Sequence, residues 1–158
     1  MSGAGEPRAG GCQCGAIRFR IVGAIDHTSL CHCRMCQKAT GGMFGAFATV
    51  RNSDLVWTRG APAYFRSSSL ASRGYCPDCG TPLTFVWDER TTSITFGAFD
   101  DPRVLTVDFA LDAENAHPAL ASLPHVRQRP IAKTDVEKSA YATLENFQHP
   151  DHDTSTWP

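Results

Sequence analysis

Seven cysteines in three short clusters constrain this chain more than any other feature of its 158 residues. The clusters are Cys12-Gln13-Cys14, Cys31-His32-Cys33-Arg34-Met35-Cys36 and Cys76-Pro77-Asp78-Cys79. An odd number of cysteines cannot all pair in disulfides, and grouped cysteines in a reducing compartment bind metal more often than they form disulfides. The pattern therefore predicts a zinc protein.

The third cluster is the most specific of the three. Sulfur ligands of a tetrahedral zinc lie roughly 3.8 Å apart, and a Cys-x-x-Cys turn such as Cys76 to Cys79 meets that spacing. Pro77 fixes its own φ, and Gly80 can adopt the positive φ that turns backbone N–H groups toward the sulfurs. This turn is therefore predicted to supply two ligands.

The first cluster needs a bend in the chain. Positions i and i+2 of a straight strand share a face but are too far apart to bind one metal ion. Gly11 and Gly15 flank Cys12 and Cys14 and allow the chain to turn there.

The middle cluster places three cysteines within six residues. Catalytic zinc sites use three protein ligands and keep one position open, whereas four ligands close a structural site. The simplest partition is therefore a closed site of Cys12, Cys14, Cys76 and Cys79 and an open site of Cys31, Cys33 and Cys36. A zinc ribbon of Cys33, Cys36, Cys76 and Cys79 is the rival partition, although its connection is longer than in most ribbons.

Other residues around the middle cluster have several possible roles. His32 is a candidate metal ligand, a candidate acid–base group or a structural residue. Arg34 and Lys38 are exposed charges or partners of a substrate carboxylate. Gly41-Gly42 indicates a tight turn. Phe44 and Phe47 are expected in the core rather than in a substrate wall.

Short period-two segments separated by Gly, Pro and Ser predict a mainly β fold. In residues 16–22, Ile17, Phe19 and Ile21 are expected to face the core while Arg18 and Arg20 face solvent. The expected strands are residues 16–22, 43–50, 55–57, 63–65, 83–87, 93–99 and 104–111, with a hairpin connection at 89–92.

The C-terminal part of the sequence predicts a helix rather than strands. Thr134-Asp135-Val136-Glu137 matches a capping box, so a helix is predicted over 135–147, packed on the sheet. A loose tail is expected over 149–158. The apolar face of the helix would consist of Val136, Ala140, Leu144 and Phe147.

Composition excludes several functions. The net charge is -1 and no basic stripe is present, so neither nucleic acid nor an anionic membrane is an expected partner. No apolar run reaches the length of a membrane span, and the first residues lack the apolar region of a secretory signal. We expect a cytoplasmic protein with a flexible leader over residues 1–9.

The ordered set of cysteine motifs resembles that of the glutathione-dependent formaldehyde-activating enzyme family. The zinc domain of this family is of the same type as that of centromere protein V. The matching residues are Gly11-Cys12-x-Cys14-Gly15, Cys31-His32-Cys33-x-x-Cys36 with Gly41, and Tyr75-Cys76-x-x-Cys79-Gly80-x-x-Leu83. The resemblance spans about residues 10 to 111.

The resemblance implies a β-tent of antiparallel sheets around zinc, with two ions per chain. It implies a structural zinc on Cys12, Cys14, Cys76 and Cys79 and a second zinc on Cys31, Cys33 and Cys36. It also implies condensation of formaldehyde with glutathione, which is classed with the carbon–sulfur lyases. The expected zinc domain covers residues 10–130, followed by the helix and tail over 131–158.

Two functions follow as expectations. In the first, an open zinc on Cys31, Cys33 and Cys36 delivers the thiolate of glutathione or a similar thiol to an aldehyde, with His32 as a candidate proton donor. The candidates to bind the carboxylates of glutathione are Arg18, Arg34, Lys38, Arg51 and Arg73. In the second, the protein is a non-catalytic, zinc-stabilised β-scaffold that binds a protein partner.

Overall fold

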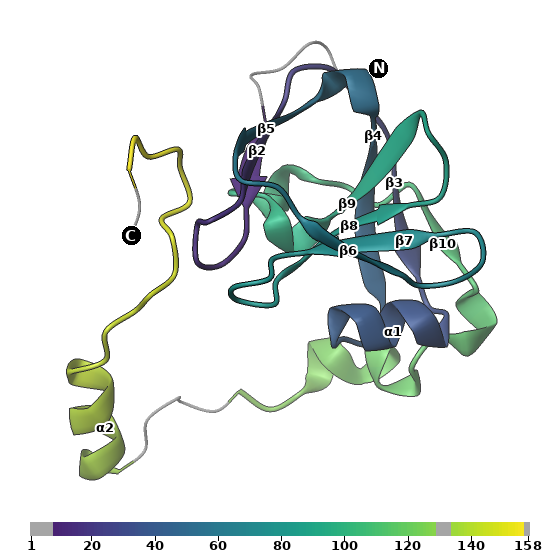
Figure 1. The fold of residues 1–158 in the computed structure, drawn as a ribbon. Coiled ribbons are helices and arrows are strands. Elements are labelled where there is room, and N and C mark those ends of the chain that lie inside the picture. The colour runs from purple at the N-terminus through teal and green to yellow at the C-terminus, as the bar shows by residue number, and fades with distance from the viewer. Residues whose placement is uncertain (1–7, 129–133, 157–158) are drawn as a thin grey trace.

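Two β-sheets form most of the protein, seen here in a computed structural model that describes residues 8–128 and 134–156 (Figure 1). The smaller sheet has the strand order β1-β2-β5, and the larger has the order β10-β3-β4-β9-β8-β7-β6. The predicted mainly β fold is thereby confirmed. The strands are β1 (Arg8–Gly11), β2 (Arg18–Ile21), β3 (Ile25–Cys31), β4 (Gly45–Arg51), β5 (Leu55–Arg59), β6 (Ala63–Arg66), β7 (Ser72–Tyr75), β8 (Pro82–Val86), β9 (Thr91–Thr95) and β10 (Phe109–Leu111).

Strand pairing is antiparallel, as expected, except at one edge. β10 lies parallel to β3, with Phe109 opposite Ser29. Thr28 fixes this edge, because its backbone N–H and its hydroxyl both donate to the Asp108 carboxylate, at 2.8 and 3.1 Å. Parallel neighbours need a long connection, and the chain between β3 and β10 builds most of the larger sheet before it returns.

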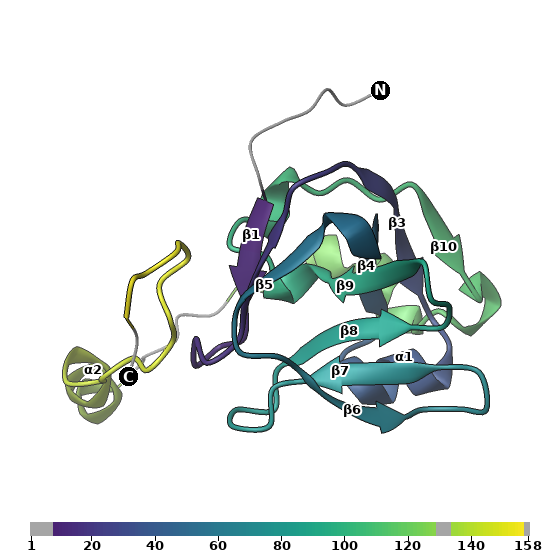
Figure 2. The same ribbon diagram turned by 45° about the horizontal axis from the view of Figure 1, so that its top comes forward.

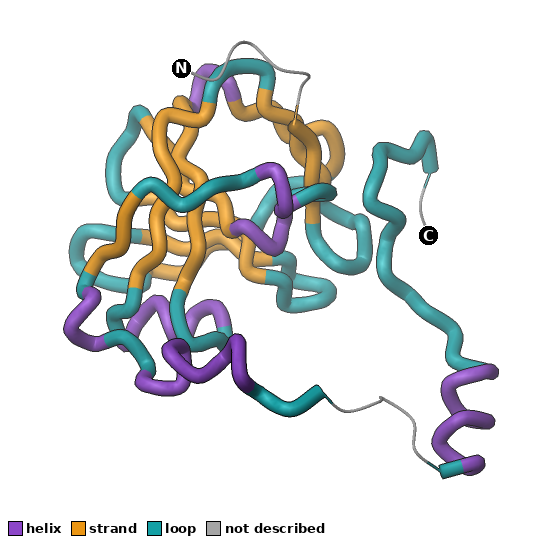
Figure 3. The backbone as a smooth tube through the Cα atoms, turned by 180° about the vertical axis from the view of Figure 1, so that it is seen from behind, coloured by secondary structure: helices purple, strands orange, loops and turns teal. Residues whose placement is uncertain are grey.

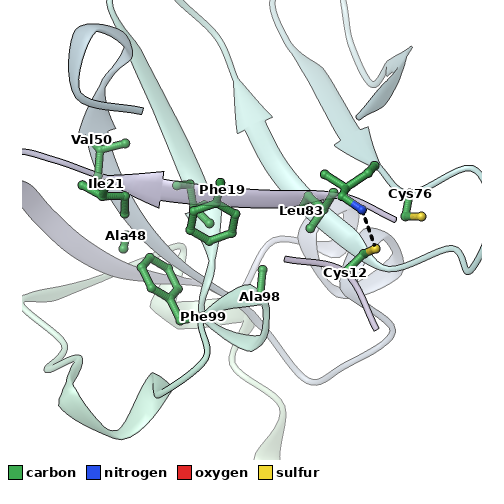
Figure 4. Packing of buried hydrophobic residues seen from close by; sticks show 11 residues of the cluster. Cys12, Phe19, Ile21, Ala48, Val50, Cys76, Leu83, Ala98 and Phe99 are labelled. Atoms are coloured by element: carbon green, nitrogen blue, oxygen red, sulfur yellow. Dashed lines mark hydrogen bonds between the residues drawn. The ribbon is translucent and has the colours of Figure 1, made fainter. Parts of the chain in front are cut away.

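The hydrophobic core lies between the two sheets (Figures 2 and 4). Phe19 of β2 is fully buried, and its ring meets Trp57 and Phe99 edge-on at centroid distances of 5.9 and 5.5 Å. Full burial of a side chain of this size contributes roughly 1.5–3 kcal/mol. The buried members of the core are Cys12, Ile17, Phe19, Ile21, Ala48, Val50, Cys76, Leu83, Ile94, Ala98 and Phe99.

Arg18 departs from the predicted alternation of β2. Arg20 is exposed as expected, but Arg18 is buried. Its guanidinium forms a bidentate ion pair with Asp100, at 2.7 Å for both bonds, and a further bond of 2.8 Å to Asp153. Arg18 was predicted to be exposed because it is charged, but its ion pairs with residues far along the chain allow it to be buried.

Two predicted strands are shorter than expected. The segment 93–99 leaves the sheet after Thr95 and continues as a 3₁₀ turn over Phe96–Ala98. Only Phe109–Leu111 of the segment 104–111 is a strand. A 3₁₀ turn occupies Pro102–Val104, where the Asp101 carboxylate accepts the Arg103 backbone N–H. Side-chain capping and a proline at the start of the turn therefore override the β-branched composition.

Several elements were not predicted. β3 and β7 are rich in polar residues, and α1 (Arg34–Thr40) begins inside the middle cysteine motif and extends beyond it. β1 begins at Arg8, inside the predicted leader, whose first seven residues lie outside the described residues. The predicted turn at Gly41-Gly42 is confirmed, since Gly41 ends α1 with a φ of 69°.

The C-terminal helix is confirmed, but it is shorter and more isolated than predicted. α2 covers Asp135–Ala142, and its capping box joins Thr134 and Glu137 as expected. The helix stands apart from both sheets (Figures 1 and 3), and the side chains of Val136, Leu144 and Phe147 are exposed. The predicted packing on the sheet is therefore wrong. No helix among the described residues is long and apolar enough to cross a membrane.

The end of the chain is docked rather than loose. His149 is buried, and its backbone N–H donates to the Gln13 carbonyl at 2.7 Å. Asp153 receives hydrogen bonds from both Arg18 and Arg20, at 2.8 and 2.6 Å, which lower the pKa of its carboxyl group. The segment therefore covers one side of the smaller sheet, and the expectation of a loose tail over the described residues 149–156 is wrong.

Candidate functional site

The first and third cysteine clusters meet in space. The four sulfurs of Cys12, Cys14, Cys76 and Cys79 lie within 4.8 Å of one another. The Sγ–Sγ distance is 3.6 Å between Cys12 and Cys14 and 3.8 Å between Cys14 and Cys76. Ligands of a tetrahedral zinc–thiolate site are separated by roughly the same distance. The donor set therefore fits a closed tetrahedral metal site.

This four-cysteine cluster links the two sheets. One pair lies in the turn between β1 and β2, and the other lies in the turn between β7 and β8. Gly15 and Gly80 follow these pairs with φ angles of 76° and 75°, a region that glycine adopts without strain. The Ile17 backbone N–H also donates to the Cys12 sulfur at 3.3 Å (Figure 4).

The thiols of this cluster differ in acidity. Burial raises the pKa of Cys76 to about 12. Burial also opposes the ionisation of Cys79, but hydrogen bonds from the hydroxyl and backbone of Thr81 outweigh it and lower the pKa to about 6. One thiolate therefore forms readily while a neighbour keeps its proton, as expected where several like charges share a site. A bound divalent cation would displace such protons.

The middle cluster forms a separate group. The sulfurs of Cys31, Cys33 and Cys36 lie within 4.8 Å of one another, whereas Cys33 and Cys36 do not join the Cys76–Cys79 turn. The rival zinc-ribbon pairing is therefore not formed. Among the described residues, this cluster has three candidate ligands, so a metal held here would keep a fourth position for another molecule.

Secondary structure positions these three thiols. Cys31 ends β3, and Cys33 is the N-cap of α1, where its sulfur accepts the Cys36 backbone N–H at 3.4 Å. Burial raises the pKa of Cys31 to about 12. Burial opposes ionisation of Cys33 as well, but hydrogen bonds from the Cys36 backbone and from neighbouring thiols lower its pKa.

A cavity of about 630 Å³ opens beside the middle cluster. Its walls come from alternate residues of six strands of the larger sheet, such as Phe47 and Thr49 of β4 and Ser93 of β9. Alternate residues share one face of a sheet, so the opposite face is the one that packs in the core. The cavity is lined by Asp26, His27, Ser29, Cys31, Cys33, Met35, Cys36, Phe47, Thr49, Arg73, Phe85, Trp87, Asp88, Thr91, Ser93, Phe109 and Leu111.

Arg73 of β7 joins the cavity to the cysteines. It is buried, its Nη2 donates to the Cys36 sulfur at 3.2 Å, and its Nε donates to the Ser67 hydroxyl at 3.0 Å. Its guanidinium carbon lies 4.8 Å from the centre of the Phe85 ring. Within the described residues, no carboxylate pairs with this buried charge. The nearby thiols are therefore its available anions.

The other predicted residues lie elsewhere. His32 is buried, with its ring 5.9 Å from that of Phe44, and it neither joins the cysteine cluster nor lines the cavity. Arg34 hydrogen-bonds Gln37 and does not line the cavity. Lys38 lines a second cavity of about 380 Å³, which shares Phe47 and Arg73 with the first.

Sequence reasoning missed most of the cavity wall. Phe47 was expected in the core, and it is indeed buried, but it also lines the cavity. Phe85 and Trp87 were placed in a strand without a site role. A signal was present, because Phe85 and Trp87 are two residues apart, as are Phe109 and Leu111, and such pairs face one side of a sheet.

The glutathione-dependent formaldehyde-activating enzyme family model matches residues 7–112. An uncharacterized lyase of Schizosaccharomyces pombe is 32% identical over 78 residues, covering 49% of this chain and 56% of the relative. A putative glutathione-dependent formaldehyde-activating enzyme of Halomonas elongata is 30% identical over 89 residues, covering 51% and 56%. The chain thus spans about half the length of these curated relatives.

The fold has also been observed in a crystal. A Rhodobacter sphaeroides protein, solved as a structural genomics target, superimposes with a TM-score of 0.51 at 22% sequence identity. The match covers 65% of this chain and 98% of that protein, and it supports the fold alone.

Proposed function

Because this chain belongs to the glutathione-dependent formaldehyde-activating enzyme family, we propose that it is a zinc-dependent enzyme of the carbon–sulfur lyase type. In the proposed reaction, a small thiol such as glutathione adds to an aldehyde, or the adduct is split in the reverse direction. The thiol loses its proton, and its sulfur forms a bond to the carbonyl carbon while the carbonyl π bond breaks. The carbonyl oxygen then takes up one proton, so the protons balance.

One observation carries this proposal: a cluster of three cysteines lies in the wall of a cavity large enough for both reactants. Cys31, Cys33 and Cys36 would hold the second zinc, while Cys12, Cys14, Cys76 and Cys79 would hold the structural one. When bound, the second zinc lowers the pKa of a thiol that joins it and so makes thiolate available at neutral pH.

Arg73 would stabilise two negative charges, the Cys36 thiolate and the oxyanion that develops on the aldehyde. Its hydrogen bond to Cys36 offsets the negative charge that three cysteinates bring to a divalent ion. Its Nη1 makes no hydrogen bond with a described residue, so it can donate to the aldehyde oxygen as negative charge develops there. Arg73 is therefore proposed as the group that stabilises the oxyanion.

The proton on oxygen need not come from His32. The ring of His32 packs beside Phe44 outside the cavity, whereas the cavity itself opens to solvent. Water can therefore supply this proton, and we propose a positioning role for His32 beside the cysteine motif. His32→Ala is expected to slow turnover less than loss of a cysteine.

The proposal is tested by exchange NMR on an equilibrium mixture of glutathione and formaldehyde, with and without protein. We expect the zinc-loaded protein to accelerate exchange between free formaldehyde and its glutathione adduct. Metal analysis of the same sample should give two zinc ions per chain. Unchanged exchange across a panel of small thiols and aldehydes, in protein with both ions, would contradict the enzyme proposal and favour the partner-binding scaffold.

Arg73→Gln is expected to lower the rate of this exchange on the order of a hundredfold, as for loss of one oxyanion donor. Glutamine keeps a hydrogen-bonding amide but not the charge. Arg73→Lys keeps the positive charge but lacks the planar guanidinium group with its several donors, so it should recover part of the rate. Arg34→Gln is the matched control, because Arg34 belongs to the middle cysteine motif but does not line the cavity. Equal rates in Arg73→Gln and Arg34→Gln would exclude the role of Arg73.

A further inference from the structure

We propose that the thiol used at this site carries an uncharged, apolar group about the size of a phenyl ring, and that such a thiol is preferred over glutathione. This inference rests on the proposed function, because it names the substrate class for the same cavity.

The walls of the cavity are aromatic. Phe85 and Trp87 stand on one side, and Phe109 and Leu111 stand on the other, where β10 covers the edge of β3. Trp87 is 64% exposed and Leu111 is 50% exposed, so large apolar surfaces face an open cavity. Exposed apolar surface of this kind marks a binding site for an apolar group.

The charges that line the cavity match the two carboxylates of glutathione poorly. Asp26 and Asp88 lie in the lining, and Arg73 is the lining residue that carries a permanent positive charge. The Arg73 guanidinium contacts Cys36 and Phe85, and in the proposed reaction its Nη1 donates to the aldehyde oxygen, so it is not left for a carboxylate. Arg51 approaches Asp26 at 3.8 Å, but its side chain is largely exposed and does not line the cavity.

The other basic residues cannot complete a glutathione site in the present arrangement. Arg18 is paired with Asp100 and Asp153 on the smaller sheet. Arg34 lies outside the cavity, and Lys38 lines the smaller neighbouring one. The two carboxylates of glutathione would therefore lose water without gaining matched partners, which is costly.

The cavity extends along β3 away from the cysteines. Cys31, Ser29 and His27 line it in succession, and Asp26 lies at its far end. At about 3.3 Å per residue, Cys31 and His27 are roughly 13 Å apart. A thiol whose sulfur reached the cysteine cluster could therefore lay an aryl or short alkyl group along this length, between the aromatic walls.

Isothermal titration of the zinc-loaded protein with four thiols tests this inference. 2-Phenylethanethiol is the apolar probe, and 3-mercaptopropionate is the charged probe with the same two-carbon linker. 2-Mercaptoethanol is the small neutral reference, and glutathione is the family thiol. We expect 2-phenylethanethiol to bind at least tenfold more tightly than glutathione. Its binding should also shift the NMR resonance of the Trp87 indole N–H.

Two variants separate the contributions of wall and charge. Trp87→Ala should weaken 2-phenylethanethiol binding by about threefold to tenfold and leave 2-mercaptoethanol binding unchanged. Tyr64→Ala is the control, because Tyr64 is a half-exposed aromatic residue of the same sheet outside this cavity. Asp26→Asn should strengthen glutathione binding without affecting 2-phenylethanethiol.

The results distinguish this inference from the proposed function. Glutathione binding as tight as that of 2-phenylethanethiol would overturn the inference and leave the thiol-adding enzyme in place. Absence of binding by all four thiols, with both zinc ions present, would overturn the proposed function and this inference with it. A dimer that buries Trp87, detected by analytical ultracentrifugation and by Trp87 fluorescence, would assign the apolar walls to self-association and overturn the inference.

Discussion

Cys79→Ser is expected to abolish the cooperative thermal unfolding of this protein. Cys79 belongs to the four-cysteine cluster, which ties the turn between β1 and β2 to the turn between β7 and β8. Zinc binding to such a site contributes roughly 10–16 kcal/mol to folding, which is comparable to the whole stability of a domain. Cys14→Ser should have the same effect, because it removes the corresponding ligand from the other sheet.

Thermal melts followed by circular dichroism would measure this difference. Cys33→Ser is the matched control, since it makes the same chemical change in the cluster whose cysteines span only residues 31–36. We expect Cys33→Ser to retain a cooperative melt at a modestly lower temperature. If Cys33→Ser unfolded the protein while Cys79→Ser did not, the assignment of the structural site would be wrong.

Cys36→Ser is expected to eliminate thiol binding while the protein stays folded. Removing one of three thiolates should cost the second zinc most of its affinity, and the serine hydroxyl can still accept a hydrogen bond from Arg73. Glutathione-dependent exchange should fall to the level of the protein-free mixture. The folded state should persist because the four-cysteine cluster is intact.

The measurement combines zinc content, thermal melting and exchange NMR on one preparation. We expect one zinc per chain in Cys36→Ser and two in the wild-type protein. Met35→Leu is the control, because Met35 also lines the cavity but offers no thiolate. Full exchange activity in Cys36→Ser with one zinc remaining would show that the chemistry does not depend on this cluster.

Local features of the site could be predicted from the sequence, because a few neighbouring residues determine them. The turn from Cys76 to Gly80 depends on its own backbone, and the positive φ of Gly80 is confirmed. The choice between the partition into four and three cysteines and the zinc-ribbon partition depends instead on which distant turn lies next to Cys76. Spacing left both open until the family resemblance was considered, and sheet packing decides it in the structure.

Features that depend on distant partners were harder to predict. Arg18 is buried because Asp100 and Asp153, which are 82 and 135 residues away, supply carboxylates to it. The cavity was missed because its walls come from six short strands, which contribute only one or two residues each apart from β3. The edge strand β10 was overestimated in length because the β-branched residues Val104, Thr106 and Val107 favour strands, while the local capping by Asp101 is specific to a turn.

The separation of the two cysteine clusters along the chain imposes an order on synthesis. A nascent chain has made five of its seven cysteines by residue 36, so the three-cysteine set is complete early. The four-cysteine set lacks Cys76 and Cys79 at that point and is complete only when residue 79 has been added. Zinc that arrives in this interval can be held by Cys12 or Cys14 together with thiols of the other set. If the two clusters bind zinc as proposed, such ligation has to be undone by ligand exchange when β7 and β8 bring Cys76 and Cys79 to Cys12 and Cys14.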